Sequence, residues 1–140
     1  ALPISVAGRR AWLPAIGRRE VLVVDTQSWQ ETARVAVAGQ PVFVMARPDG
    51  RQVWVNFAVP DYDTLQVIDT ERAAVVQTLK PGKAILHMEF TPRGEAVWVS
   101  ARDSNTVTVL DTRSFATLAQ FEARAPSGIF FAARAVKVGL

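Results

Sequence analysis

The sequence repeats itself with a period of 42 to 44 residues, and this period limits the available folds more than any other feature. Three tryptophans recur at spacings of 42 and 44 residues: Trp12, Trp54 and Trp98. Three Asp-Thr pairs recur at spacings of 44 and 42, beginning at Asp25, Asp69 and Asp111. A fixed period of this length is typical of architectures in which one supersecondary unit is stacked several times.

Each repeat has the pattern of a set of short strands. Runs rich in Val, with alternating apolar and polar residues, surround the Trp and precede the Asp-Thr pair, and such runs favour strands. In the middle repeat the expected strands are 41–46, 53–57, 65–70 and 74–79. A Pro-x-Gly turn lies before the Trp strand at 48–50 and again at 92–94, as in a hairpin whose turn needs Gly. We therefore predict an all-β chain of four-stranded antiparallel units.

Four strands in about 40 to 45 residues is the size of a propeller blade. A chain of 140 residues holds only about three such blades, whereas a closed ring needs about four to eight. We therefore expect one partial β-propeller over residues 1–140. The predicted boundaries are a partial blade at 1–39, whole blades at 40–82 and 83–125, and the inner strand of the closing blade at 126–140.

Composition removes several classes of function. The net charge is only +3 and the basic residues are scattered, so no nucleic-acid-binding stripe is expected. The absence of Cys excludes disulfides, thiolate metal sites and covalent attachment of a c-type haem within this chain. No apolar run approaches the roughly 18 residues of a membrane span. Motifs for phosphate binding and for hydrolytic nucleophiles are also missing, so independent chemistry of those kinds is not expected.

Two segments are more specific than the general repeat. Residues 85–100 read Ile-Leu-His-Met-Glu-Phe-Thr-Pro-Arg-Gly-Glu-Ala-Val-Trp-Val-Ser, and residues 125–135 read Ala-Pro-Ser-Gly-Ile-Phe-Phe-Ala-Ala-Arg-Ala. Together they resemble the last blades of the haem d1 propeller family. The Leu-His-Met-Glu-Phe and Pro-Ser-Gly-Ile-Phe-Phe patterns are most similar to the haem d1 biogenesis branch, the NirF and NirN proteins. The d-haem domain of cytochrome-type nitrite reductase is a more distant resemblance.

This resemblance implies a fold, a ligand and a compartment. The fold is a complete ring of about eight blades, at the upper end of the range for propellers. The ligand is haem d1 or its dihydro precursor, and the role is haem d1 biosynthesis for nitrite reductase in the denitrification pathway of the bacterial periplasm. Other maturation proteins or nitrite reductase are the implied partners, and a dehydrogenase-like oxidoreductase is the implied enzyme class. A non-catalytic YVTN-type propeller scaffold stays open as the alternative, because the general repeat resembles that class too.

His87 is the only histidine in the sequence, and it lies on the expected inner strand 84–91. Alternation along this strand places Glu89 on the same face. The inner strand of a blade lines the central channel, where an imidazole can exchange a proton or, by the resemblance, ligate haem iron. A hydrogen-bonded structural histidine between blades is the alternative. Both interpretations of His87 stay open.

Five further residues are candidates for binding the tetrapyrrole. The resemblance implies that the segment with Ser127, Gly128 and Phe130 packs along the macrocycle. Gly admits close approach, the aromatic ring suits a flat apolar ligand, and the hydroxyl suits a ring carboxylate. Arg47 and Arg134 are the expected partners of further ring carboxylates. The alternatives are core packing for Phe130, a turn cap for Ser127 and solvated surface positions for both arginines.

Overall fold

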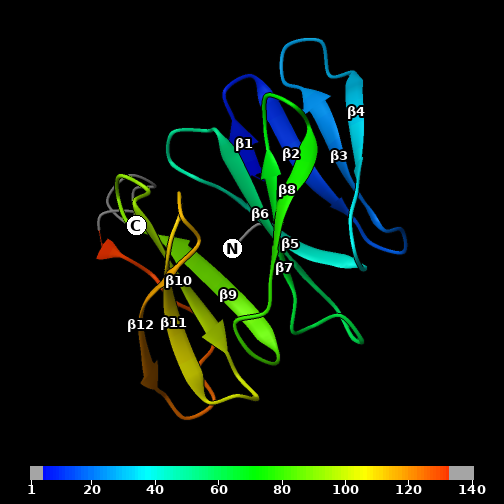
Figure 1. The fold of residues 1–140 in the computed structure, drawn as a ribbon. Coiled ribbons are helices and arrows are strands. Elements are labelled where there is room, and N and C mark those ends of the chain that lie inside the picture. The colour runs from blue at the N-terminus through cyan, green and yellow to red at the C-terminus, as the bar shows by residue number, and fades with distance from the viewer. Residues whose placement is uncertain (1–4, 133–140) are drawn as a thin grey trace. The chain divides into compact units, whose positions relative to one another are not determined.

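The computed structural model describes residues 5–132, which form three four-stranded antiparallel sheets (Figure 1). The first sheet contains β1 (Ser5–Ala7), β2 (Arg10–Ala15), β3 (Glu20–Asp25) and β4 (Glu31–Ala36). The second contains β5 (Pro41–Ala46), β6 (Gln52–Phe57), β7 (Leu65–Asp69) and β8 (Ala74–Leu79). The third contains β9 (Ile85–Phe90), β10 (Ala96–Ala101), β11 (Thr106–Asp111) and β12 (Thr117–Glu122). Strands pair in chain order, so each sheet is a meander with the form of a propeller blade.

The all-β prediction and the four-stranded unit are confirmed. The strands expected at 41–46 and 74–79 coincide with β5 and β8. The first repeat, expected as a partial blade, has four strands, of which β1 has only three residues. Residues 126–131, which we call the C-terminal segment, form no strand. The remainder of the predicted closing strand, residues 133–140, lies outside the described residues.

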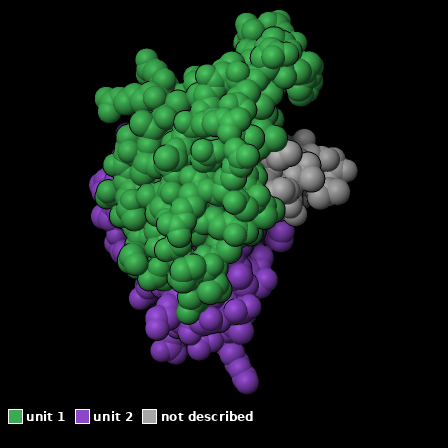
Figure 2. Space-filling model, turned by 90° about the vertical axis from the view of Figure 1, so that its right-hand side faces the viewer, with its two compact units in different colours: residues 1–80 green, residues 81–140 purple. Residues whose placement is uncertain are grey.

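The chain divides into two compact units, residues 1–80 and 81–140, which are coloured separately in Figure 2. The two sheets of the first unit bury a shared apolar cluster that includes Trp12, Val21, Val23, Val53, Val55 and Ile68. Burial of this apolar surface is the main force that joins the sheets. Two hydrogen bonds add specificity: the Ala38 amide donates to Gln66 Oε1 at 2.8 Å, and the Ala46 amide donates to Ser5 Oγ at 2.7 Å.

The aspartate of each Asp-Thr pair holds the turn that follows it. Asp111 Oδ1 accepts hydrogen bonds from the amides of Arg113 at 2.8 Å and Ser114 at 2.7 Å. Asp25 and Asp69 accept equivalent bonds from backbone amides of their own turns. The recurrence of these aspartates therefore reflects turn chemistry and not catalysis.

The threonine of each pair ties that turn to the preceding hairpin. The Thr70 hydroxyl donates to the carbonyl of Gly50 at 2.7 Å, and the Thr112 hydroxyl donates to the carbonyl of Gly94 at 2.5 Å. Both glycines belong to the Pro-x-Gly turns before the Trp strands. The repeat thus encodes a hydrogen bond between two loops as well as an alternation of strands.

The second unit contains the single sheet β9–β12. In its register His87 is opposite Ser100, and Glu89 is opposite Trp98. Because opposed residues on antiparallel strands project to the same side, these four side chains share one face of the sheet. β12 is an edge strand of this unit's sheet, and all six of its residues are exposed.

Candidate functional site

His87 is held in place by the sheet itself. It lies on β9 and is only 7% exposed. Its backbone amide donates to Ser100 Oγ at 3.1 Å, and the Ser100 hydroxyl lies 3.3 Å from the carbonyl oxygen of His87. Ser100 is fully buried. A buried hydroxyl on β10 therefore binds the backbone of β9 at the residue that carries the imidazole.

The imidazole of His87 contacts the C-terminal segment. The Ile129 amide donates to His87 Nδ1 at 3.2 Å. The ring of Phe130 lies 5.1 Å from the imidazole, centroid to centroid, at an interplanar angle of 42°. An acceptor nitrogen needs its lone pair, so the proton of the neutral imidazole is on Nε2. In this arrangement Nε2 is a hydrogen-bond donor, whereas coordination of iron through Nε2 would require the opposite tautomer.

Adjacent phenylalanines of the C-terminal segment contact different aromatic residues. Phe130 meets His87, whereas the ring of Phe131 meets Trp98 edge-on at 5.7 Å and 88°. Phe121 of β12 contacts the same indole at 5.7 Å and 66°. The segment thereby covers part of the face that bears His87 and Trp98.

Phe130 is the most exposed of these rings, with 68% of its surface accessible against 45% for Phe121. A Cβ atom on Gly128 would lie 3.0 Å from Phe130 Cε2, so the missing side chain leaves room for the ring. Ser127 is exposed to solvent. The arrangement offers one side of an aromatic ring to a flat ligand. Arg134, predicted to bind a carboxylate, lies outside the described residues.

Arg47 already has a carboxylate beside it. Its Nε donates to Asp49 Oδ1 at 2.8 Å, and a second nitrogen pairs with Oδ2 at 2.5 Å. The hydrogen bond to Asp49 raises the pKa of Arg47, and the same bond is the main cause that lowers the pKa of Asp49. Only 12% of the Arg47 side chain is exposed. This pairing stabilises the turn at 48–50, and the haem-carboxylate role of Arg47 stays a prediction.

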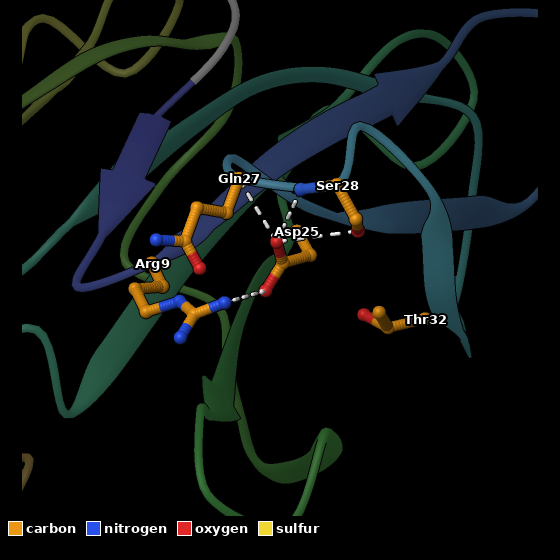
Figure 3. A pocket seen from close by; sticks show the side chains of 5 residues that line it. All are labelled: Arg9, Asp25, Gln27, Ser28 and Thr32. Carbon is orange, nitrogen blue, oxygen red and sulfur yellow. Dashed lines mark hydrogen bonds and ion pairs between the residues drawn. The ribbon is translucent and has the colours of Figure 1, made fainter.

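An open depression of about 400 Å³ lies on the first unit (Figure 3). Its lining consists of Arg9, Asp25, Gln27, Ser28 and Thr32. Arg9 pairs with Asp25 at 3.2 Å. The amides of Ser28 and Gln27 are the main cause that lowers the pKa of Asp25 below its usual value. These polar groups stabilise a turn, and an open polar depression does not suit a flat, largely apolar macrocycle.

Sequence reasoning placed His87 and Glu89 on one face, and the register agrees, with Glu89 buried at 2% exposure. It did not connect Trp98 with Phe131, nor His87 with the Ile129 amide. These contacts join a repeated strand to a segment outside the repeat, and no periodicity points to them.

Within residues 5–132 no group of three or more His, Cys, Asp or Glu side chains is arranged to hold a metal ion. The same residues include no helix long and apolar enough to cross a membrane.

Comparison with known sequences identifies relatives over nearly the whole chain. Residues 5–135 match the family model described as the cytochrome D1 heme domain. The chain is 52% identical over 136 residues to Protein NirF of Stutzerimonas stutzeri, and 51% identical over 136 residues to Protein NirF of Pseudomonas aeruginosa. Each alignment covers 97% of this chain and 35% of the relative. The chain therefore spans about a third of the length of the curated relatives it matches.

Comparison with solved structures shows the same architecture. Hydrazine synthase of Kuenenia stuttgartiensis matches with a TM-score of 0.78 and 23% identity, over 88% of this chain and 36% of that one. Dihydro-heme d1 dehydrogenase NirN in complex with DHE matches with a TM-score of 0.77 and 24% identity, over 85% of this chain and 26% of that one. At these identities the likeness concerns the fold, and the three sheets are a fragment of a propeller.

Proposed function

The chain belongs to the cytochrome D1 heme domain family, and we propose on that basis that it forms part of a propeller that binds haem d1 or its dihydro precursor during haem d1 biosynthesis. The observation that carries the proposal is the 52% identity to Protein NirF over 97% of the chain. That alignment is long enough to include both the β9–β12 sheet and the C-terminal segment. The proposal places the protein in the periplasm, with other haem d1 maturation proteins or nitrite reductase as its partners.

The residues of the second unit suit a flat macrocycle. Phe130 exposes 68% of its surface, and Gly128 leaves room for its ring. We assign Phe130 to stacking on the ring system, and the Ser127 hydroxyl to one of its carboxylates. The counter-charge roles of Arg134 and of Arg47, which belongs to the first unit and pairs with Asp49, stay predictions from the resemblance. The tetrapyrrole, when bound, supplies the redox chemistry, and the protein orients it and manages protons.

His87 enters this proposal through Nδ1, which accepts a hydrogen bond from the Ile129 amide at 3.2 Å. That bond joins the sheet to the segment that carries Phe130, the ring we assign to stacking on the ligand.

A second candidate function is a propeller scaffold without chemistry. One observation favours it: His87 is 7% exposed and accepts a hydrogen bond from a backbone amide, as a purely structural histidine would. Under this hypothesis His87 only joins two segments of the chain, and no tetrapyrrole binds.

Titration of the complete propeller with haem d1 separates the two functions. Binding should shift the visible spectrum at one equivalent, and haem b should bind more weakly because it lacks the additional ring substituents. Loss of a stacking contact in Phe130→Leu should weaken haem d1 binding by roughly 2- to 12-fold. Phe121→Leu is the matched control, because Phe121 lies on the edge strand and contacts Trp98. A protein with no spectral response to any d-type tetrapyrrole would be a scaffold.

A further inference from the structure

We propose that His87 is a positioning residue, which holds the C-terminal segment against the sheet through the Ile129 amide and thereby presents the Phe130 ring to the tetrapyrrole. This inference rests on the proposed function, because it names the residue that prepares the proposed binding surface. It assigns the effect of His87 to Nδ1 and a backbone amide, not to a bond with iron.

The first step is that the two sides of this contact differ in rigidity. His87 belongs to a strand whose backbone is bonded to the buried Ser100. The C-terminal segment forms no strand, so no sheet ladder defines its path. The hydrogen bond that the Ile129 amide donates to His87 therefore satisfies a backbone group of the segment, as strand pairing does elsewhere.

The second step concerns the side chains on either side of that bond. Phe131 is directed to Trp98, while Phe130 rests against the imidazole with most of its surface exposed. Contacts at Ile129 and Phe131 restrain the backbone on both sides of Phe130, and the imidazole contacts one side of its exposed ring. A ring that is ordered before binding loses less conformational entropy when the ligand arrives.

The third step is that positioning and iron ligation need opposite tautomers. As an acceptor for the Ile129 amide, Nδ1 has no proton and Nε2 has one. Iron coordination through Nε2 would move the proton to Nδ1, where it would face the Ile129 N–H. The two hypotheses therefore assign function to different nitrogens of one ring, and substitutions can separate them.

Three variants of His87 in the complete propeller make this separation. His87→Asn keeps an acceptor close to the position of Nδ1 and deletes Nε2. His87→Gln extends its amide towards the position of Nε2 and leaves no acceptor at Nδ1. His87→Ala removes both groups. Hydrogen exchange of the Ile129 amide in the ligand-free protein reports the contact itself, and titration with haem d1 reports its consequence.

We expect His87→Asn to retain Ile129 protection and the haem d1 spectrum of the wild type. In His87→Ala and His87→Gln the Ile129 amide should exchange its hydrogen up to about tenfold faster, as expected for the loss of one hydrogen bond. Both variants should bind haem d1 more weakly by a similar factor. Phe130→Leu should keep Ile129 protected and still lose affinity, which identifies the ring as the group that is positioned.

Two results would overturn the inference. One is equal Ile129 exchange in all variants, which would show that His87 does not hold the segment. The other is a His87→Asn protein that keeps Ile129 protected but has the spectrum of His87→Ala, which would assign the role to Nε2. If the wild type gives no response to haem d1, the proposed function fails and the presentation of Phe130 to a tetrapyrrole fails with it. The exchange data would still decide whether His87 holds the segment.

Discussion

Replacement of Thr112 by Val tests whether the hydrogen bond between repeat loops stabilises the fold. Thr112 is fully buried, and its hydroxyl lies 2.5 Å from the Gly94 carbonyl and 3.1 Å from the Glu95 carbonyl. Valine has nearly the same shape but no donor. The variant therefore removes the hydroxyl without creating a large cavity.

The cost follows from the burial of the acceptor. Gly94 is itself buried, so its carbonyl loses a donor at a site that water does not readily reach. An orphaned buried group costs about 1 to 3 kcal/mol, and we expect Thr112→Val to destabilise the protein by that amount. The equivalent Thr26 donates to the carbonyl of the more exposed Arg9 at 2.9 Å. Water can replace that bond, so Thr26→Val should cost less than about 1 kcal/mol.

The assay is urea unfolding of the complete propeller, with wild type, Thr112→Val and Thr26→Val measured in parallel. Far-UV circular dichroism before unfolding checks that each variant has the native sheet content. Equal destabilisation by the two substitutions would refute the argument, because it would show that burial of the acceptor does not set the cost. A Thr112→Val protein as stable as the wild type would refute it as well.

Two further predictions concern a repeated turn and the C-terminal segment. The amides of Ser114 and Arg113 lower the pKa of Asp111 below its usual value of 3.8, so its carboxylate stabilises the fold above about pH 4 and loses this effect as the pH falls through the folded-state pKa. Asp111→Asn should therefore have a lower urea midpoint than the wild type near pH 6, and the difference should narrow towards pH 2; a difference independent of pH would contradict this. Gly128→Ala should displace the exposed Phe130 ring by a few tenths of an ångström, because the new Cβ would lie 3.0 Å from Cε2; the haem d1 spectrum should change while stability stays within about 0.5 kcal/mol, and an unchanged spectrum would remove Gly128 from the proposed binding surface.

Most of the fold could be predicted from the sequence, because its determinants are local and repeated. Alternation of apolar residues assigns the strands, and Pro-x-Gly turns set the hairpins. The chemistry of Asp111 is local too, since its partners are two and three residues away. Arg47 could have been interpreted from the sequence as well, because its partner Asp49 follows two residues later.

The surroundings of equivalent residues depended on tertiary structure. Trp12, Trp54 and Trp98 occupy one position of the repeat, yet the first two are fully buried and Trp98 is only half-buried. A repeat specifies which way a side chain points, but what covers that side chain depends on the segment that packs there.

For His87 the sequence by itself determined the strand and the face, and it left open a role at the haem, by proton exchange or iron ligation, and a structural role. The tertiary structure decided which atoms meet the imidazole. Nδ1 accepts a hydrogen bond from the amide of Ile129, which lies 42 residues further along the chain and outside the repeated blades. Only folding brings that amide within hydrogen-bond distance, and with it the tautomer of the ring is determined.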